Sequence, residues 1–259
     1  MRNWLKVMSL AFVIVFASCS DSGNPVKPDP KDRIRALIAQ TPRADTEAEL
    51  AALWLSREFV VSESLYVEMR DALKAVRRTY ASPSSQIDDI QFTHWWGVRK
   101  MFPLLSAQGI SDYRAGRHHD LDSLTELLNG ETIDTLALPF MESFMVTIQF
   151  AGILNLDSVE VMYESLPSVG AVSHYGSIGD WPNFYPWRLP DGRLTLLFRD
   201  AWGDCPSGCI YSHFWYFRID GDSIEYVGDY LADHEKPEPD WWPEAKVAFY
   251  KFVFGKLPS

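Results

Sequence analysis

The chain has 259 residues, with 24 Lys or Arg, 35 Asp or Glu and a formal net charge of −11. This balance argues against a nucleic-acid partner, because Lys and Arg supply most of the affinity for phosphate groups. Hydrophobic residues make up 47% and aromatic residues 14% of the chain, which excludes a disordered protein and predicts a globular core.

The first 18 residues are typical of an export signal, which is cleaved from the mature protein. Two basic residues precede an apolar run over 7–17, and this run is shorter than the roughly 20 residues of a membrane-spanning helix. The segment resembles a bacterial lipoprotein signal, cut by signal peptidase II before a diacylated cysteine, with Phe16 where that family usually has Leu. The resemblance implies that Cys19 carries lipid, palmitate included. An ordinary secretory signal is the alternative.

The predicted anchor would hold the protein in the bacterial cell envelope, at the outer membrane or the periplasmic face. After the signal peptide 1–18, residues 19–32 contain three prolines and predict an extended tether. Residues 33–85 predict a helical hairpin, in which Thr46 and Glu49 have the spacing of a capping box. The second helix is indicated by apolar residues at three- and four-residue steps: Leu65, Met69, Ala72, Leu73, Val76 and Tyr80.

Residues 86–259 predict an α+β domain, so the fold class expected for the chain is α+β. Its first half indicates a strand near Val98–Leu105, at a sheet edge because of Pro103. There follow a helix His119–Leu128, strands Thr132–Leu138 and Phe144–Ala151, a helix capped by Asp157, and a strand Val169–His174. This βαββαβ order predicts a ferredoxin-like core.

The second half predicts antiparallel β-hairpins. Strands are indicated at Leu194–Arg199, Ile210–Ile219 and Ile224–Tyr230, with an Asp-Gly turn at Asp220. The pattern of Lys246–Phe254 fits a helix and a strand equally well.

Cys205 and Cys209 close an Asp-Cys-Pro-Ser-Gly-Cys loop between two predicted strands. We expect a disulfide that fixes the shape of the loop, since redox enzymes use a Cys-x-x-Cys spacing and zinc needs four ligands. No metal site and no cofactor is therefore predicted. The stretch from Trp202 to Ile210 is similar to secreted bacterial proteins of unknown function.

Several aromatic residues lie in polar or proline-containing segments, where their rings are candidates for stacking on sugars or peptides. The candidate binding residues are Trp181, Trp187, Trp202, His213, Trp241 and Trp242. Trp95 and Trp96 lie in a similar setting. The alternative is that these side chains cover the core.

No catalytic motif is present, and the sequence favours a non-enzymatic envelope lipoprotein that binds a protein or glycan partner. A second hypothesis comes from Tyr163–Gly170, which resembles the end of subtilisin-propeptide or inhibitor domains and implies a protease-linked module. An enzyme of unrecognised class is the third.

Overall fold

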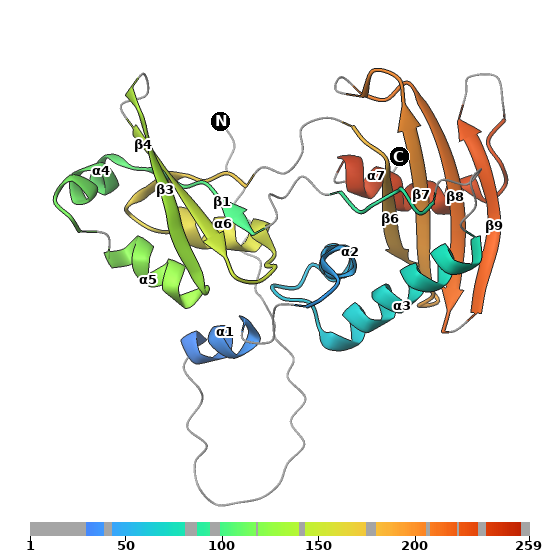
Figure 1. Cartoon of the computed structure of the whole chain (residues 1–259), viewed down its shortest axis with the longest axis horizontal. Helices are drawn as coiled ribbons and strands as arrows, with labels where there is room; N and C mark the ends of the chain where they lie inside the picture. Colours follow the sequence, from blue (N-terminus) through green and yellow to red (C-terminus); the bar gives the residue numbers. More distant parts are fainter. Residues whose placement is uncertain are drawn as a thin grey trace, which may run out of the picture.

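The computed structural model describes residues 30–38, 43–80, 87–93, 99–117, 119–139, 143–174, 180–205, 208–221, 223–232 and 237–254. These residues form a mixed α+β structure with seven helices and two antiparallel sheets (Figure 1). The predicted α+β class is confirmed. Residues 1–29, with Cys19, and Trp95 and Trp96 lie outside the described residues.

The first sheet is built around β4. Its strands are β1 (Lys100–Met101), β2 (Leu104–Leu105), β3 (Gly130–Leu138), β4 (Ser143–Phe150) and β5 (Val169–Ala171). Strand β4 pairs with β3 on one side and with both β1 and β2 on the other, and β2 also pairs with β5. All of these pairings are antiparallel, and β3 pairs with β4 from Gly130↔Phe150 to Leu138↔Ser143, with a register shift between Thr132 and Asp134.

The expectation that Pro103 marks an edge strand is wrong. Strand β2 lies between β4 and β5, and Pro103 directly precedes it, in the gap between β1 and β2. Proline has no N–H, but its carbonyl still accepts a bond from Val146 N, at 2.8 Å. Because Pro103 has no backbone N–H to donate, it interrupts an inner strand of the sheet, but that strand is not at the sheet edge.

Three helices accompany this sheet: α4 (Ala107–Arg114), α5 (His119–Leu127) and α6 (Leu156–Glu164). The sequence did not predict α4, whose N-cap Ser106 accepts a bond from Gly109 N. The cap predicted for α6 is also wrong, because Asn155 and not Asp157 accepts the bond from Ser158 N. The helix therefore begins two residues earlier and places Leu156 in the core.

The second sheet is a four-stranded meander in the order β6-β7-β8-β9. Its strands are β6 (Asn183–Arg188), which the sequence did not predict, β7 (Leu194–Trp202), β8 (Tyr211–Asp220) and β9 (Ser223–Ala232). All residues from Leu194 to Arg199 are buried. Because successive side chains of a strand point to opposite faces, both faces of this sheet must be covered.

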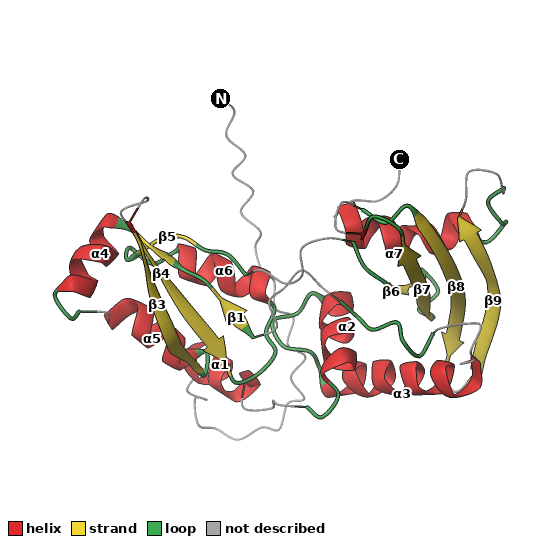
Figure 2. Cartoon of the chain, turned by 45° about the horizontal axis from the view of Figure 1, so that its top comes forward, coloured by secondary structure: helices red, strands yellow, loops and turns green. Residues whose placement is uncertain are grey.

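Helix α3 (Glu63–Tyr80) and helix α7 (Trp242–Phe254) cover opposite faces of the second sheet (Figure 2). The ring of Tyr80 packs 5.1 Å from Phe217, and the ring of Phe249 packs 5.7 Å from Phe214. Phe214 and Phe217 are three residues apart on β8, so they point to different faces. We call these the α3 face and the α7 face. The ambiguous segment Lys246–Phe254 is thus helical.

Helix α2 (Thr46–Ser56) precedes α3 and contacts β6, while α1 (Pro30–Ile38) lies near α5. The predicted capping box at Thr46 is wrong, because the N-cap is Asp45, whose carboxylate accepts a bond from Ala48 N. Glu49 is instead buried, and burial raises its pKa despite the nearby Arg43.

The two sheets are joined through a polar residue at the base of α6. Asn155 is buried; its Nδ2 donates to Arg57 O and its backbone N donates to Phe59 O. Buried side chains of both sheets belong to one continuous hydrophobic cluster. Among the helices described, none has the length and apolar character needed to cross a membrane.

Candidate binding site at the disulfide end of the second sheet

The predicted pair Cys205 and Cys209 is joined by a disulfide in the loop between β7 and β8. The loop reverses sharply at Gly203 and Gly208, whose φ angles of 101° and 115° favour glycine. A Cβ on Gly203 would also lie 3.0 Å from Ile210 Cβ. These two glycines and the disulfide together define one compact turn.

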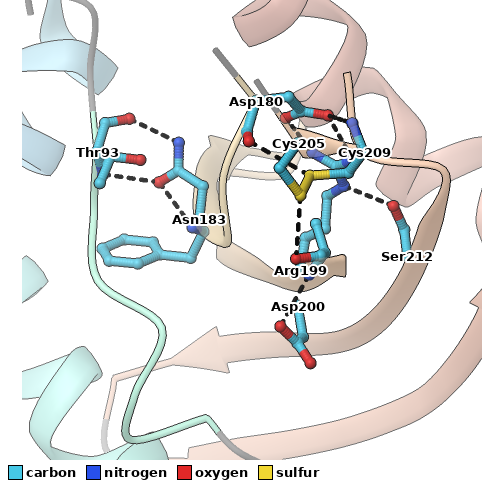
Figure 3. A network of polar contacts seen from close by, with 10 residues as sticks. Thr93, Asp180, Asn183, Arg199, Asp200, Cys205, Cys209 and Ser212 are labelled. Atoms are coloured by element: carbon cyan, nitrogen blue, oxygen red, sulfur yellow. Dashed lines mark hydrogen bonds and ion pairs between the residues drawn. A yellow bond between two sulfur atoms is a disulfide. The ribbon is translucent and has the colours of Figure 1, made fainter. Parts of the chain in front are cut away.

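Asp180 connects this turn to the sheet. Its backbone N donates to Cys205 O at 2.9 Å, and its Oδ2 accepts from Cys209 N at 3.2 Å. The same carboxylate forms a two-point ion pair with Arg199 of β7, with Nη2 donating to Oδ2 at 2.8 Å. Figure 3 shows the Asp180 carboxylate next to the disulfide loop, with its bonds to Arg199 and Cys209 as dashed lines.

Arg199 links Asp180 to Ser212 of β8. Its side chain is only 3% exposed, and its Nε donates to Ser212 Oγ at 2.8 Å. The guanidinium also lies 5.3 Å from the ring of Phe249 on α7. A contiguous set of polar contacts therefore runs from the disulfide through Asp180 and Arg199 to Ser212.

The charges in this network hold each other ionised. Burial alone would raise the pKa of Asp180, but hydrogen bonds from Arg199 and Cys209 N lower it below its ordinary value. Burial would lower the pKa of Arg199, and the bonds to Asp180 reverse this and raise it. Next to them, burial raises the pKa of Tyr185 to about 12. Asp180 and Arg199 are therefore both charged at neutral pH. Because these opposite charges are adjacent, the electric field of the pair is small at longer distance.

A cavity of about 560 Å³ lies on the α7 face beside this network. Its apolar wall comes from Ile210, just before β8, and from β8, β9 and α7, which contribute Phe214, Tyr230, Trp242, Phe249 and Tyr250. Two polar side chains, Ser212 and Glu238, also line it. A cavity of this volume, lined by rings and a few polar groups, has the general form of a small-molecule site.

The α3 face carries a separate group of side chains at the same end of the sheet. The ring of Trp202 stacks on Tyr211, with centroids 5.9 Å apart, and His213 lies 4.0 Å from Trp215. His213 Nε2 and Asp229 Oδ2 lie 2.7 Å apart. The structure thus separates a cavity on one face from an exposed aromatic surface on the other.

The six candidate binding residues are not brought to one place. Trp202 and His213 lie on the α3 face. Trp242 is buried and lines the cavity on the α7 face, where Trp241 stacks on Tyr216. Trp187 pairs with Thr195, at the opposite end of the strands, and Trp181 is exposed beside Asp180.

The residues that build the network were missed from sequence. Arg199 offered a signal, because a charged residue inside an apolar strand usually needs a buried partner. Asp180 offered none, since its partner is 19 positions away and the pairing of β6 with β7 brings them together. Phe249 was missed because the pattern of its segment did not identify a helix.

The described residues contain no group of three His, Cys, Asp or Glu side chains that could hold a metal ion. Comparison with protein-family models, with curated proteins and with solved structures found no match for the chain.

Proposed function

We propose that this protein is a non-enzymatic binding protein of the bacterial cell envelope, anchored through lipid on Cys19, which takes an apolar group of a partner or ligand into the cavity on the α7 face. The observation that carries the proposal is the aromatic-lined cavity of about 560 Å³ between the sheet and α7. Rings supply apolar contact area, and Ser212 and Glu238 supply the few polar groups that orient a ligand.

Hydrogen bonds, an ion pair and ring contacts hold the wall of the cavity in place. Ser212 is held by Arg199, which is held by Asp180 and through it by the disulfide loop. Trp242 packs on Phe214, with centroids 4.7 Å apart, from the helix side. Such preorganised walls lower the entropy that binding would otherwise lose.

We also propose that residues 99–171 have a ferredoxin-like arrangement. Taking β1 and β2 as one interrupted strand, the pairing order β3-β4-β1/β2-β5 supports it. The same order favours the second candidate, a protease-inhibitor or propeptide-like module. That candidate predicts inhibition of subtilisin-like proteases at micromolar concentrations of the mature protein.

The cavity is tested with the neutral apolar dye N-phenyl-1-naphthylamine. We expect saturable dye binding to the wild-type protein and its loss in Ala232→Trp, because Ala232 lines the cavity and a large ring there would fill it. Ala137→Trp is the matched control, since Ala137 is exposed on β3 of the other sheet. Unchanged dye affinity in Ala232→Trp, with its melting temperature preserved, would contradict the proposal.

The anchor is tested separately in a bacterial host. Cys19→Ala should abolish incorporation of labelled palmitate and move the protein from the membrane to the soluble envelope fraction, because only the lipid holds it there. Cys205→Ala is the control, which should keep its label. Membrane fractionation of Cys19→Ala identical to wild type would refute the anchor.

A further inference from the structure

The α3 face presents an exposed aromatic surface next to the disulfide loop. We name Trp202, Tyr211, His213 and Trp215 the aromatic strip. Trp202 pairs with Tyr211 across β7 and β8, and the two rings are 41% and 47% exposed with planes only 23° apart. His213 covers Trp215, which is buried. The strip therefore offers solvent a flat outer pair of rings and an imidazole beside it.

The charged groups around the strip are acidic. Asp200 pairs with His213 in register, and Asp229 pairs with Trp215. Strands β7 to β9 contain no Lys and two Arg, Arg199 and Arg218. Both Arg residues pair with residues of the α7 face, Phe214 and Thr195, so within β7 to β9 the α3 face has carboxylates and one imidazole but no Arg. Arg188 of β6 shares this face, but it lies at the opposite end of the strands and pairs with Glu68 of α3.

Asp229 is held in place and kept ionised. Its Oδ1 accepts from Tyr226 OH at 2.8 Å and its Oδ2 contacts His213. Burial alone would raise its pKa, but the hydrogen bonds from His213 and Tyr226 lower it below the ordinary value. A carboxylate oxygen has two lone pairs, so each oxygen of Asp229 can accept one further bond.

From this geometry we infer a second binding site, at which the aromatic strip receives an arginine side chain from a basic segment of a partner protein. A guanidinium is planar, stacks on Trp and Tyr faces, and donates to carboxylates in pairs. Asp200 and Asp229 supply those carboxylates, and the net charge of −11 attracts a basic segment over longer range. Charge complementarity favours this partner over a neutral glycan, whose hydroxyls can donate to the two carboxylates but bring no opposite charge.

This site is independent of the cavity, because it lies on the opposite face of the sheet and shares only Tyr211 with the cavity wall. Variants that avoid Tyr211 therefore separate the two. Trp202→Ala and Asp200→Asn alter the strip, and Tyr250→Ala and Glu238→Gln alter the cavity.

The test uses the full mature chain and a fluorescein-labelled peptide of four arginines, followed by anisotropy. We expect saturable binding that weakens with added salt, about two- to fivefold weaker binding in Trp202→Ala, and roughly tenfold weaker binding in Trp202→Ala/Asp200→Asn. Tyr250→Ala and Glu238→Gln should bind the peptide as wild type does, while Tyr250→Ala loses affinity for the apolar dye.

Three outcomes would overturn the inference. The first is equal affinity for a peptide of four citrullines, which keeps the shape of the arginine peptide but not its charge. Trp202→Ala and its double variant could retain full affinity while their melting temperatures show that they fold. A neutral oligosaccharide such as chitohexaose could bind at Trp202 while the arginine peptide does not. None of these results bears on dye binding in the cavity.

Discussion

At the scale of single residues, Asp180 and Arg199 form an ion pair whose guanidinium is buried. The Arg199 side chain is 3% exposed and its guanidinium is satisfied by Asp180, Ser212 and the ring of Phe249. A buried cation that loses its counter-ion must either stay uncompensated or draw water into the core. The stability of this end of the sheet therefore depends on one carboxylate.

Asp180→Asn should lower the free energy of unfolding by about 3 kcal/mol at pH 7, because it leaves the Arg199 charge without a partner. Urea unfolding followed by circular dichroism measures this. Asp191→Asn is the control, since Asp191 pairs with Arg193 on an exposed hairpin and should have almost no effect. Equal stabilities of Asp180→Asn and wild type would show that the ion pair is not required.

The effect should depend on pH with a defined sign. The folded-state pKa of Asp180 is lowered, so its contribution is present above its unfolded value, near 4, and is lost as the pH falls toward the folded value. The stability difference between wild type and Asp180→Asn should therefore be constant from pH 7 to about pH 4 and shrink below that. A difference that stays constant down to pH 2.5 would contradict this assignment.

At the scale of elements, the disulfide loop contributes more by positioning neighbouring residues than by restricting the unfolded chain. Cys205 and Cys209 are four positions apart, so closing the ring contributes only about 2 kcal/mol in the chain-entropy model. The bonds from the loop to Asp180 give it a second effect, because they hold the carboxylate that orders Arg199 and Ser212.

The double variant Cys205→Ala/Cys209→Ala should unfold at lower urea concentration, by about 2 kcal/mol, and should also bind the apolar dye more weakly than wild type. Hydrogen exchange should increase at Asp180 and Cys209, whose backbone N–H groups bond within the loop region. Amide protection unchanged at both positions would mean that the loop keeps its shape without the disulfide.

At the scale of the whole molecule, the two sheets lie side by side but share one hydrophobic cluster (Figure 1). Asn155 bonds the base of α6 to the segment after α2, and α2 in turn contacts β6. Contacts of this kind couple neighbouring parts of a fold, so the two sheets should unfold together.

We expect a single cooperative transition on heating or in urea. Residues 99–174 contain no Trp, so tryptophan fluorescence reports on other parts of the chain, whereas far-ultraviolet circular dichroism reports on both sheets. The two signals should give the same midpoint. Two separate midpoints would show that the sheets are independent folding units.

Local patterns of the sequence were sufficient for strands β7 to β9, for helices α3 and α5 and for the disulfide, but not for β6, α4 or α7. Turn residues, three- and four-residue periodicity and cysteine spacing act between near neighbours, so they can be read without a fold. Pro103, Thr46 and Asp157 were misjudged where a residue's role depended on partners beyond its own segment. Proline could interrupt an inner strand because a neighbouring strand still used its carbonyl.

The sequence by itself determined that the chain is an acidic, aromatic-rich α+β protein with a short cysteine loop between strands. Only the tertiary structure decided which rings became cavity wall and which stayed exposed. Trp242 is buried because α7 lies across the sheet, whereas Trp202 on the opposite face remains open to solvent. Strand pairing likewise brought Asp180 to Arg199. These outcomes depend on contacts between distant segments, which no local pattern of the sequence encodes.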